Sequence, residues 1–245
     1  METESRDGHL IPDKARVLSG SLLKLIAVVS MLIDHVGAVI VIRYPRVPLI
    51  SLGSHTLTLY ALMRFLGRMA FPLYAFLITE GFVHTGDRRK YALRLLLFAL
   101  LSEVPFDLAF NGTWFAIKNQ NVFFTLFLGF LGLCALDRFS GSGWKQLLSL
   151  LGLFLAALFL KCDYGVSGYG FILLMYALRK ERILRAVIGA GYLSSRWKAG
   201  LAFLPIALYS GKRGFVRGRV WQYVFYVFYP GHLLLLYWIS RQLFG

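Results

Sequence analysis

The sequence predicts an all-α fold, a polytopic bundle of transmembrane helices. Hydrophobic residues make up 58% of the 245 positions and charged residues only 16%, and the mean hydropathy of +0.63 lies above the range of soluble globular domains. Apolar runs recur along the whole chain, separated by short segments that carry charges, glycines and prolines. Because no internal repeat or low-complexity linker interrupts this pattern, we expect residues 1–245 to form a single integral membrane domain.

About nine apolar runs are expected to be spans, and counts of eight or ten remain open. Residues 1–18 precede them, carry both charge signs and are expected to form a short cytosolic lead. The first run is too long for a signal peptide and holds ionisable residues, so we expect it to remain as the first helix. Several runs are shorter than the ~20 residues of a straight crossing, so tilted, broken or re-entrant segments are expected, above all between residues 160 and 210. The expected spans are residues 19–42, 57–82, 91–110, 121–137, 145–161, 166–178, 183–195, 198–210 and 220–241.

The distribution of basic residues predicts the orientation of these spans. Alternate connections, beginning with the amino-terminal lead, contain 16 of the 27 Lys and Arg residues, the other connections contain seven, and four lie inside spans. Since cytoplasmic loops are enriched in Lys and Arg, we expect the amino terminus in the cytosol and the carboxyl terminus outside. This topology accounts for most of the net charge, and without a basic stripe we expect no nucleic-acid partner. Cys134 and Cys162 match no zinc, haem or redox spacing, and we expect no metal.

The first helix contains three ionisable residues within a length that must cross lipid. Lys24 and His35 are eleven positions apart, almost three helical turns, so they share one face about 16 Å apart along the axis. Asp34 lies at nearly the depth of His35. Each such group costs about 2.5–3.5 kcal/mol at the centre of a membrane helix, so we expect these three to face a polar interior and to take part in function.

Later helices add charged and polar residues, most of them at a depth similar to that of His35. A buried layer of mixed charge is typical of a reaction or transport centre. The same residues can have structural roles, as interhelical ion pairs, as a packing histidine near the kink at Pro230, or as helix caps. These residues are Arg64 and Arg68 in the second helix, Arg94, Glu103 and Asp107 in the third, Gln120 and Asn121 at the start of the fourth, and Tyr229 and His232 in the ninth.

Several stretches in order along nearly the whole chain resemble the TraX family of membrane proteins. They include Gly-Arg-Met-Ala-Phe-Pro at residues 67–72 and Tyr-Pro-Gly-His at residues 229–232. The founding activity of the family is acetylation of the amino terminus of conjugative F pilin, so the resemblance implies a membrane acetyltransferase. The matching stretches are residues 24–37, 67–82, 91–106, 120–126, 163–165, 209–214 and 225–233.

A second resemblance concerns the first helix alone. Membrane acyltransferase family 3 has an arginine, ten intervening residues and a histidine on its first helix, and Lys24 and His35 repeat this spacing with lysine in place of arginine. The resemblance implies that His35 is the catalytic base and that Lys24 is a cation on the side of the acyl donor. Lysine lacks the forked guanidinium, so its contact with a phosphate differs from that of arginine.

Together these observations predict an acyltransferase of the cell membrane that moves an acetyl group from cytosolic acetyl-CoA to an amine or hydroxyl. The acceptor is expected to be a peptide or small molecule at the membrane or its outer face. Two other interpretations stay open, a proton-coupled transporter that uses the charged layer as a relay and a non-catalytic assembly protein. The expected catalytic residues are His35, Asp34 or Glu103 to orient its ring, and Arg68 to stabilise the oxyanion. The expected donor-binding residues are Lys24, Arg94 and Arg64, and the expected acceptor-binding residues are His232, Asp107, Gln120, Asn121 and Tyr229.

Overall fold

The structure is a computed structural model that describes residues 15–45, 48–52, 55–196, 199–216 and 218–245, and it confirms the all-α fold. Most of the expected amino-terminal lead, residues 1–14, lies outside the described residues. Among the described residues, the segments Gly20–Arg43, Leu59–His84 and Val220–Phe244 are long and apolar enough to cross a membrane. The helices are α1 (Gly20–Val39), α2 (Leu59–Gly67), α3 (Ala70–His84), α4 (Arg88–Asn111), α5 (Val122–Arg138), α6 (Gly143–Phe159), α7 (Gly165–Ala177), α8 (Arg182–Arg196), α9 (Phe203–Ala207) and α10 (Gly218–Phe244).

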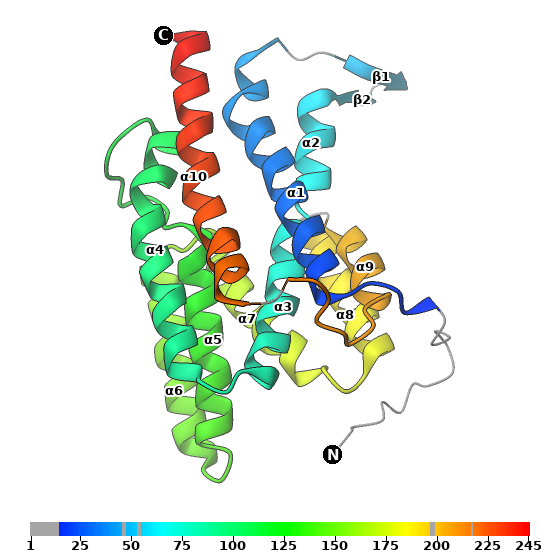
Figure 1. Cartoon of the computed structure of the whole chain (residues 1–245), viewed down its shortest axis with the longest axis vertical. Coiled ribbons are helices and arrows are strands. Elements are labelled where there is room, and N and C mark those ends of the chain that lie inside the picture. Colours follow the sequence, from blue (N-terminus) through cyan, green and yellow to red (C-terminus); the bar gives the residue numbers. More distant parts are fainter. Residues whose placement is uncertain (1–14, 46–47, 53–54, 197–198, 217) are drawn as a thin grey trace.

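The helices form an elongated bundle in which α1 and α10 run in the same direction (Figure 1). We call the end at which α1 and α10 begin the basal end, and the turns that follow α3, α5 and α7 lie on the same side (Figure 1). The opposite, distal end contains the end of α10. The segment before α10 returns to the start of α1, where the N–H groups of Gly20 and Ser21 donate to the carbonyl groups of Lys212 and Arg213 at 2.8 and 2.9 Å.

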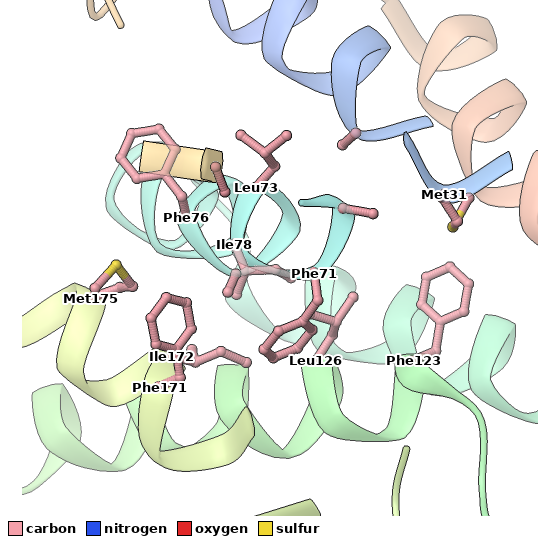
Figure 2. Packing of buried hydrophobic residues seen from close by; sticks show 14 of the residues in the cluster. Met31, Phe71, Leu73, Phe76, Ile78, Phe123, Leu126, Phe171, Ile172 and Met175 are labelled. Carbon is pink, nitrogen blue, oxygen red and sulfur yellow. The ribbon is translucent and has the colours of Figure 1, made fainter. Parts of the chain in front are cut away.

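Side chains from α3, α5 and α7 fill the core between the helices (Figure 2). Phe71, Phe171 and Met175 are almost completely buried there. A Cβ atom at Gly129 of α5 would overlap Ile172 of α7, so the glycine allows these two helices to approach closely. Small residues at such crossings are typical of membrane helices, which associate through close packing.

Residues 48–58 contain a two-stranded antiparallel hairpin that was not among the expected elements. Strand β1 (Pro48–Leu52) pairs with β2 (His55–Thr58), and Ile50 in β1 and Thr56 and Thr58 in β2 are β-branched residues that suit strands. The expected span at residues 57–82 therefore begins slightly later, and a turn at Arg68 and Met69 divides it into α2 and α3.

The expected span at residues 198–210 is wrong. Its described residues form only a 3₁₀ turn, η3 (Gly200–Ala202), and the five-residue helix α9. Pro205 and the short apolar run disfavour a longer helix, since proline lacks the N–H that a helix interior requires. Helices α8 and α9 pack against each other, and α9 lies beside α3 (Figure 1). The chain then returns to the start of α1, so α1 still begins at the basal end and α10 still ends at the distal end.

Polar side chains join the helices at the basal end. Asp87 accepts a hydrogen bond from the Lys90 N–H at 2.9 Å and so caps α4. This bond, with a second from the Lys90 side chain, lowers the pKa of the exposed Asp87 carboxyl. Arg88 forms an ion pair with Asp137 of α5, and its guanidinium carbon lies 4.3 Å from the ring centroid of Phe82 in α3. These contacts tie α3, α4 and α5 together.

Candidate active site

A cavity of about 540 Å³ lies between α1, α3, α4, α5 and α10, a size typical of small-molecule sites. Its lining at the basal end, which includes His84 and Arg213, is exposed, whereas Met31 and Tyr229 at its inner end are buried. The cavity therefore opens at the basal end and closes in the middle of the bundle. On α1 its lining extends from Gly20 to Met31, which is about 16 Å along the helix axis.

Basic side chains line the basal half of the cavity. Lys24 of α1 and Arg213 of the segment before α10 interact as like charges. Within the described part of the chain, no ion pair neutralises either of them. Arg94 and Glu80 also line the cavity, so its net formal charge is positive. An excess of cations in one cavity forms a favourable site for an anion.

Arg94 is held in place by residues of α10. Its Nε and Nη2 atoms lie 3.2 Å from the side-chain oxygen of Gln222 when that amide faces the guanidinium. It also hydrogen-bonds to Tyr226, and its guanidinium carbon lies 5.5 Å from the ring centroid of Tyr91. Gln222, Tyr226 and Tyr229 recur at helical spacing, so one face of α10 lines the cavity. Of these three residues the sequence analysis identified only Tyr229, although the spacing is visible in the sequence.

A pair of histidines lies one helical turn beyond the inner end of the cavity. Nδ1 of His35 on α1 and Nε2 of His232 on α10 are 2.6 Å apart. The two ring planes differ by 3° and their centroids are 4.9 Å apart. That separation is the N–N distance plus about one ring radius on each side, so the rings meet edge to edge in nearly one plane. Tyr229, which lines the cavity, connects it to this pair, with its ring centroid 5.9 Å from that of His35 and 5.2 Å from that of Phe123.

Further contacts fix the orientation of both imidazole rings. Nδ1 of His232 lies 2.7 Å from the carbonyl oxygen of Phe228, one turn earlier on α10. The Phe228 ring stacks on His232 with 4.7 Å between centroids, and Phe110 of α4 packs edge-on against His35 at 5.3 Å. His232 is only 6% exposed. The sequence analysis identified both histidines but did not pair them.

The Asp34 carboxylate faces α2 and not the ring of His35. Its Oδ2 accepts a hydrogen bond from Arg64 Nη1 at 2.5 Å, which closes an ion pair between α1 and α2. Electrostatic interactions link this pair to Arg68 in the turn after α2, and to Asp163, which the sequence analysis did not include in the site. Arg64, expected to bind the donor, therefore lies beside the histidine pair and does not line the cavity.

Glu103 and Asn121 form a separate group that connects α4 to α5. The Asn121 amide donates to Glu103 Oε2 at 2.5 Å and to the Ala99 carbonyl oxygen at 2.7 Å, and its own oxygen caps α5. Glu103 was expected as one candidate to orient His35. The structure instead joins Glu103 to Asn121, and it places His232 against Nδ1 of His35.

Asp107 and Gln120 make contacts at the distal end of the bundle. Asp107 accepts hydrogen bonds from the Asn111 amide at 2.9 Å and from the Ala116 N–H at 2.7 Å, which folds the loop after α4. The backbone N–H of Gln120 donates to the carbonyl oxygen of Lys161 at 3.1 Å. The structure thus separates these residues from the cavity. Of the residues predicted for the site, those in or next to the cavity are Lys24, Arg94, Tyr229, His35 and His232.

Comparisons with known proteins match nearly the whole chain. The sequence model of the family described as TraX protein matches residues 19–240. The chain is also similar to a protein of Dichelobacter nodosus described as "Probable fimbrial assembly protein FimC, serogroup H1". The two are 31% identical over 243 residues, which cover 87% of this chain and 92% of the other. No solved structure matches the chain. The region matched by the family model contains the whole cavity lining and both histidines.

Proposed function

We propose, from the premise that the chain belongs to the TraX family, that it is a membrane acyltransferase that takes its acetyl group from acetyl-CoA. The chain is a membrane protein, and its family and its fimbrial assembly relative indicate a pilin-related role. The observation that carries the enzymatic proposal is the cavity, which has an excess of cations towards its open end and a histidine pair just beyond its closed end.

The donor and the cavity match in the order of their chemical groups. Acetyl-CoA carries its phosphate charges at one end and its thioester at the other. Lys24 and Arg213, at the basal end, would attract the phosphates, with Arg94 nearby, and the narrow arm would extend along α10 towards Tyr229. Because the loops with most Lys and Arg lie at the basal end, we propose that this end faces the cytosol, where acetyl-CoA is supplied.

The proposed reaction is a direct transfer with His35 as the general base. The acceptor nitrogen or oxygen attacks the thioester carbonyl carbon, so an amide or ester bond forms and the C–S bond breaks. The proton lost by the acceptor passes to His35 and then to the CoA sulfur, which leaves as a thiol. A general base contributes about 10²- to 10⁴-fold in rate. Arg68 keeps its predicted role in stabilising the oxyanion, with Arg64 as the cation closer to His35.

The direct test is incubation of the purified protein with labelled acetyl-CoA and synthetic peptides. One peptide carries a free terminal amine, a second has that amine blocked, and a third is blocked but contains a serine hydroxyl. We expect label to move to the peptide with the free amine or to the one with the serine hydroxyl. The second peptide, which has neither group, should stay unlabelled. Failure to label any acceptor, combined with CoA-independent solute uptake into proteoliposomes, would favour a transporter.

Donor binding has a test of its own. Adding CoA should raise the temperature of the thermal transition of the detergent-solubilised protein. At a CoA concentration of a hundred times its Kd, binding adds about 2.7 kcal/mol to the free energy of unfolding. Lys24→Ala should reduce this shift, because it removes a cation from the cavity. Lys118→Ala should not, because Lys118 lies in the exposed loop after α4 at the distal end. Equal shifts in the two variants would remove Lys24 from the donor site.

A further inference from the structure

We infer that His232 is a positioning residue that holds His35 in a single tautomer, with hydrogen on Nδ1 and a lone pair on Nε2. This inference rests on the proposed function, because it identifies Nε2 of His35 as the atom that takes the proton from the acceptor. The sequence analysis expected His232 to bind the acceptor. The inference instead gives His232 the role of orienting the imidazole of His35.

The tautomer follows from the contact between His232 and Phe228. Nδ1 of His232 lies 2.7 Å from the carbonyl oxygen of Phe228. A carbonyl oxygen can only accept a hydrogen bond, so Nδ1 of His232 must carry the hydrogen. In a neutral imidazole the other nitrogen, Nε2, then has the lone pair. His232 therefore presents an acceptor to its neighbour.

The same reasoning then fixes the state of His35. Its Nδ1 lies 2.6 Å from Nε2 of His232, and the two rings are within 3° of one plane, as a hydrogen bond between them requires. Because Nε2 of His232 accepts, Nδ1 of His35 donates. Nε2 of His35 is left as the free lone pair. A chain of two hydrogen bonds thus runs from His35 through His232 to the backbone of α10.

This chain takes the place of a carboxylate beside the catalytic histidine. Asp34 is adjacent in sequence, but its carboxylate is bound to Arg64 of α2, and Glu103 is bound to Asn121. A backbone carbonyl and a neutral imidazole orient the base without adding an unpaired negative charge at this depth, where charge is costly. When Nε2 of His35 takes the acceptor proton, the Nδ1 proton faces His232, so the two rings can share the positive charge.

The tautomer can be measured without any activity, by ¹⁵N NMR of protein labelled at histidine in detergent. We expect the His35 signals to show a protonated Nδ1 and an unprotonated Nε2. His232→Phe keeps a ring but removes the acceptor, so His35 should shift to a mixture of tautomers. His232→Gln keeps an acceptor at a similar reach and should preserve the wild-type pattern. His84, which lies at the basal end of α3, provides an unchanged reference signal in the same spectra.

Kinetics supply the second measurement. His232→Phe should lower kcat by about 10- to 100-fold, the usual effect of removing a partner that orients a key imidazole. The KM for acetyl-CoA should stay within about twofold, and His232→Gln should recover most of the kcat. A His35 protonated on Nε2 in the wild-type protein would overturn the inference, as would equal kcat values in the Phe and Gln variants. Wild-type protein with the expected tautomer but no acetyl transfer would overturn the proposed function alone.

Discussion

His35 is the residue on which the proposed chemistry depends. It lies next to the inner end of the cavity, and its ring is held by Tyr229, Phe110 and His232. Its position beyond the cavity lining separates the proposed catalytic base from the proposed donor site. Substitutions of His35 and of Lys24 should therefore have different kinetic consequences.

We expect His35→Ala to fold, enter the membrane and bind CoA, but to lose about 10²- to 10⁴-fold in kcat, because only the proton acceptor is removed. Acetyl transfer and the CoA-dependent thermal shift should be measured on the same preparation. Leu151→Ala, on the exposed face of α6, is a control for the loss of side-chain volume. A well-folded His35→Ala protein with undiminished transfer would end this mechanism.

Asn121 has a structural role, because it links α4 to α5 and caps α5. We expect Asn121→Ala to lower the free energy of unfolding by about 2 kcal/mol, since it removes a helix cap and leaves the buried Oε2 of Glu103 with only the longer bond from the backbone N–H of residue 121. Asn111→Ala is a matched control, because Asn111 donates a single bond to Asp107 at a half-buried position. The midpoint of thermal unfolding in detergent measures both. Equal losses would mean that the link between Asn121 and Glu103 adds no stability.

Among the elements, the crossing of α1 and α2 holds the charged groups beside the histidine pair. Gly67 of α2 lies directly against Asp34 of α1, and an added Cβ atom would overlap the aspartate. The glycine therefore sets the distance at which Arg64 reaches Asp34. The packing of α1 against α2 and the ion pair between Asp34 and Arg64 therefore both depend on the contact between Gly67 and Asp34.

Gly67→Ala should force the two helices apart, with a cost of about 1–3 kcal/mol typical of overpacked contacts. Acetyl transfer should fall as well, because His35 follows Asp34 on the displaced helix. Gly152→Ala is the control, since nothing lies within 4 Å of a Cβ atom built at that position of α6. There the added methyl group should stabilise the helix by about 1 kcal/mol. Equal thermal midpoints for the two variants would contradict the close contact.

At the scale of the whole molecule, the direction of the bundle in the membrane decides which side supplies the donor. Basic residues gather at the basal end, where the cavity opens. The proposed cytosolic position of this end therefore fixes both the topology and the route of acetyl-CoA. A single labelling experiment can test the two together.

We expect a cysteine at position 118 to react with an impermeant reagent added outside intact cells, and a cysteine at position 89 to react only after the membrane is opened. Lys118 lies at the distal end and Arg89 at the start of α4, and both are exposed. The background should carry Cys134→Ala and Cys162→Ala, because both native cysteines are free thiols. The reverse pattern would place the mouth of the cavity outside the cell.

The sequence by itself determined the family, the helical membrane fold and most helix positions, and family and fold are confirmed. These features depend on apolar length and on motifs local to the chain, which need no knowledge of neighbouring helices. The face shared by Lys24 and His35 could also be predicted, because helical spacing alone decides it.

Only the tertiary structure decided which polar groups meet. His35 and His232 are 197 positions apart, and their contact depends on the rotation and depth at which α1 and α10 pack. The predicted single layer of charge divides in the same way into separate pairs, Asp34 with Arg64 and Glu103 with Asn121. Hydrophobicity determines that a helix lies in the membrane. Close packing between helices determines the rotation and depth of its polar side chains, and therefore which partner each of them meets.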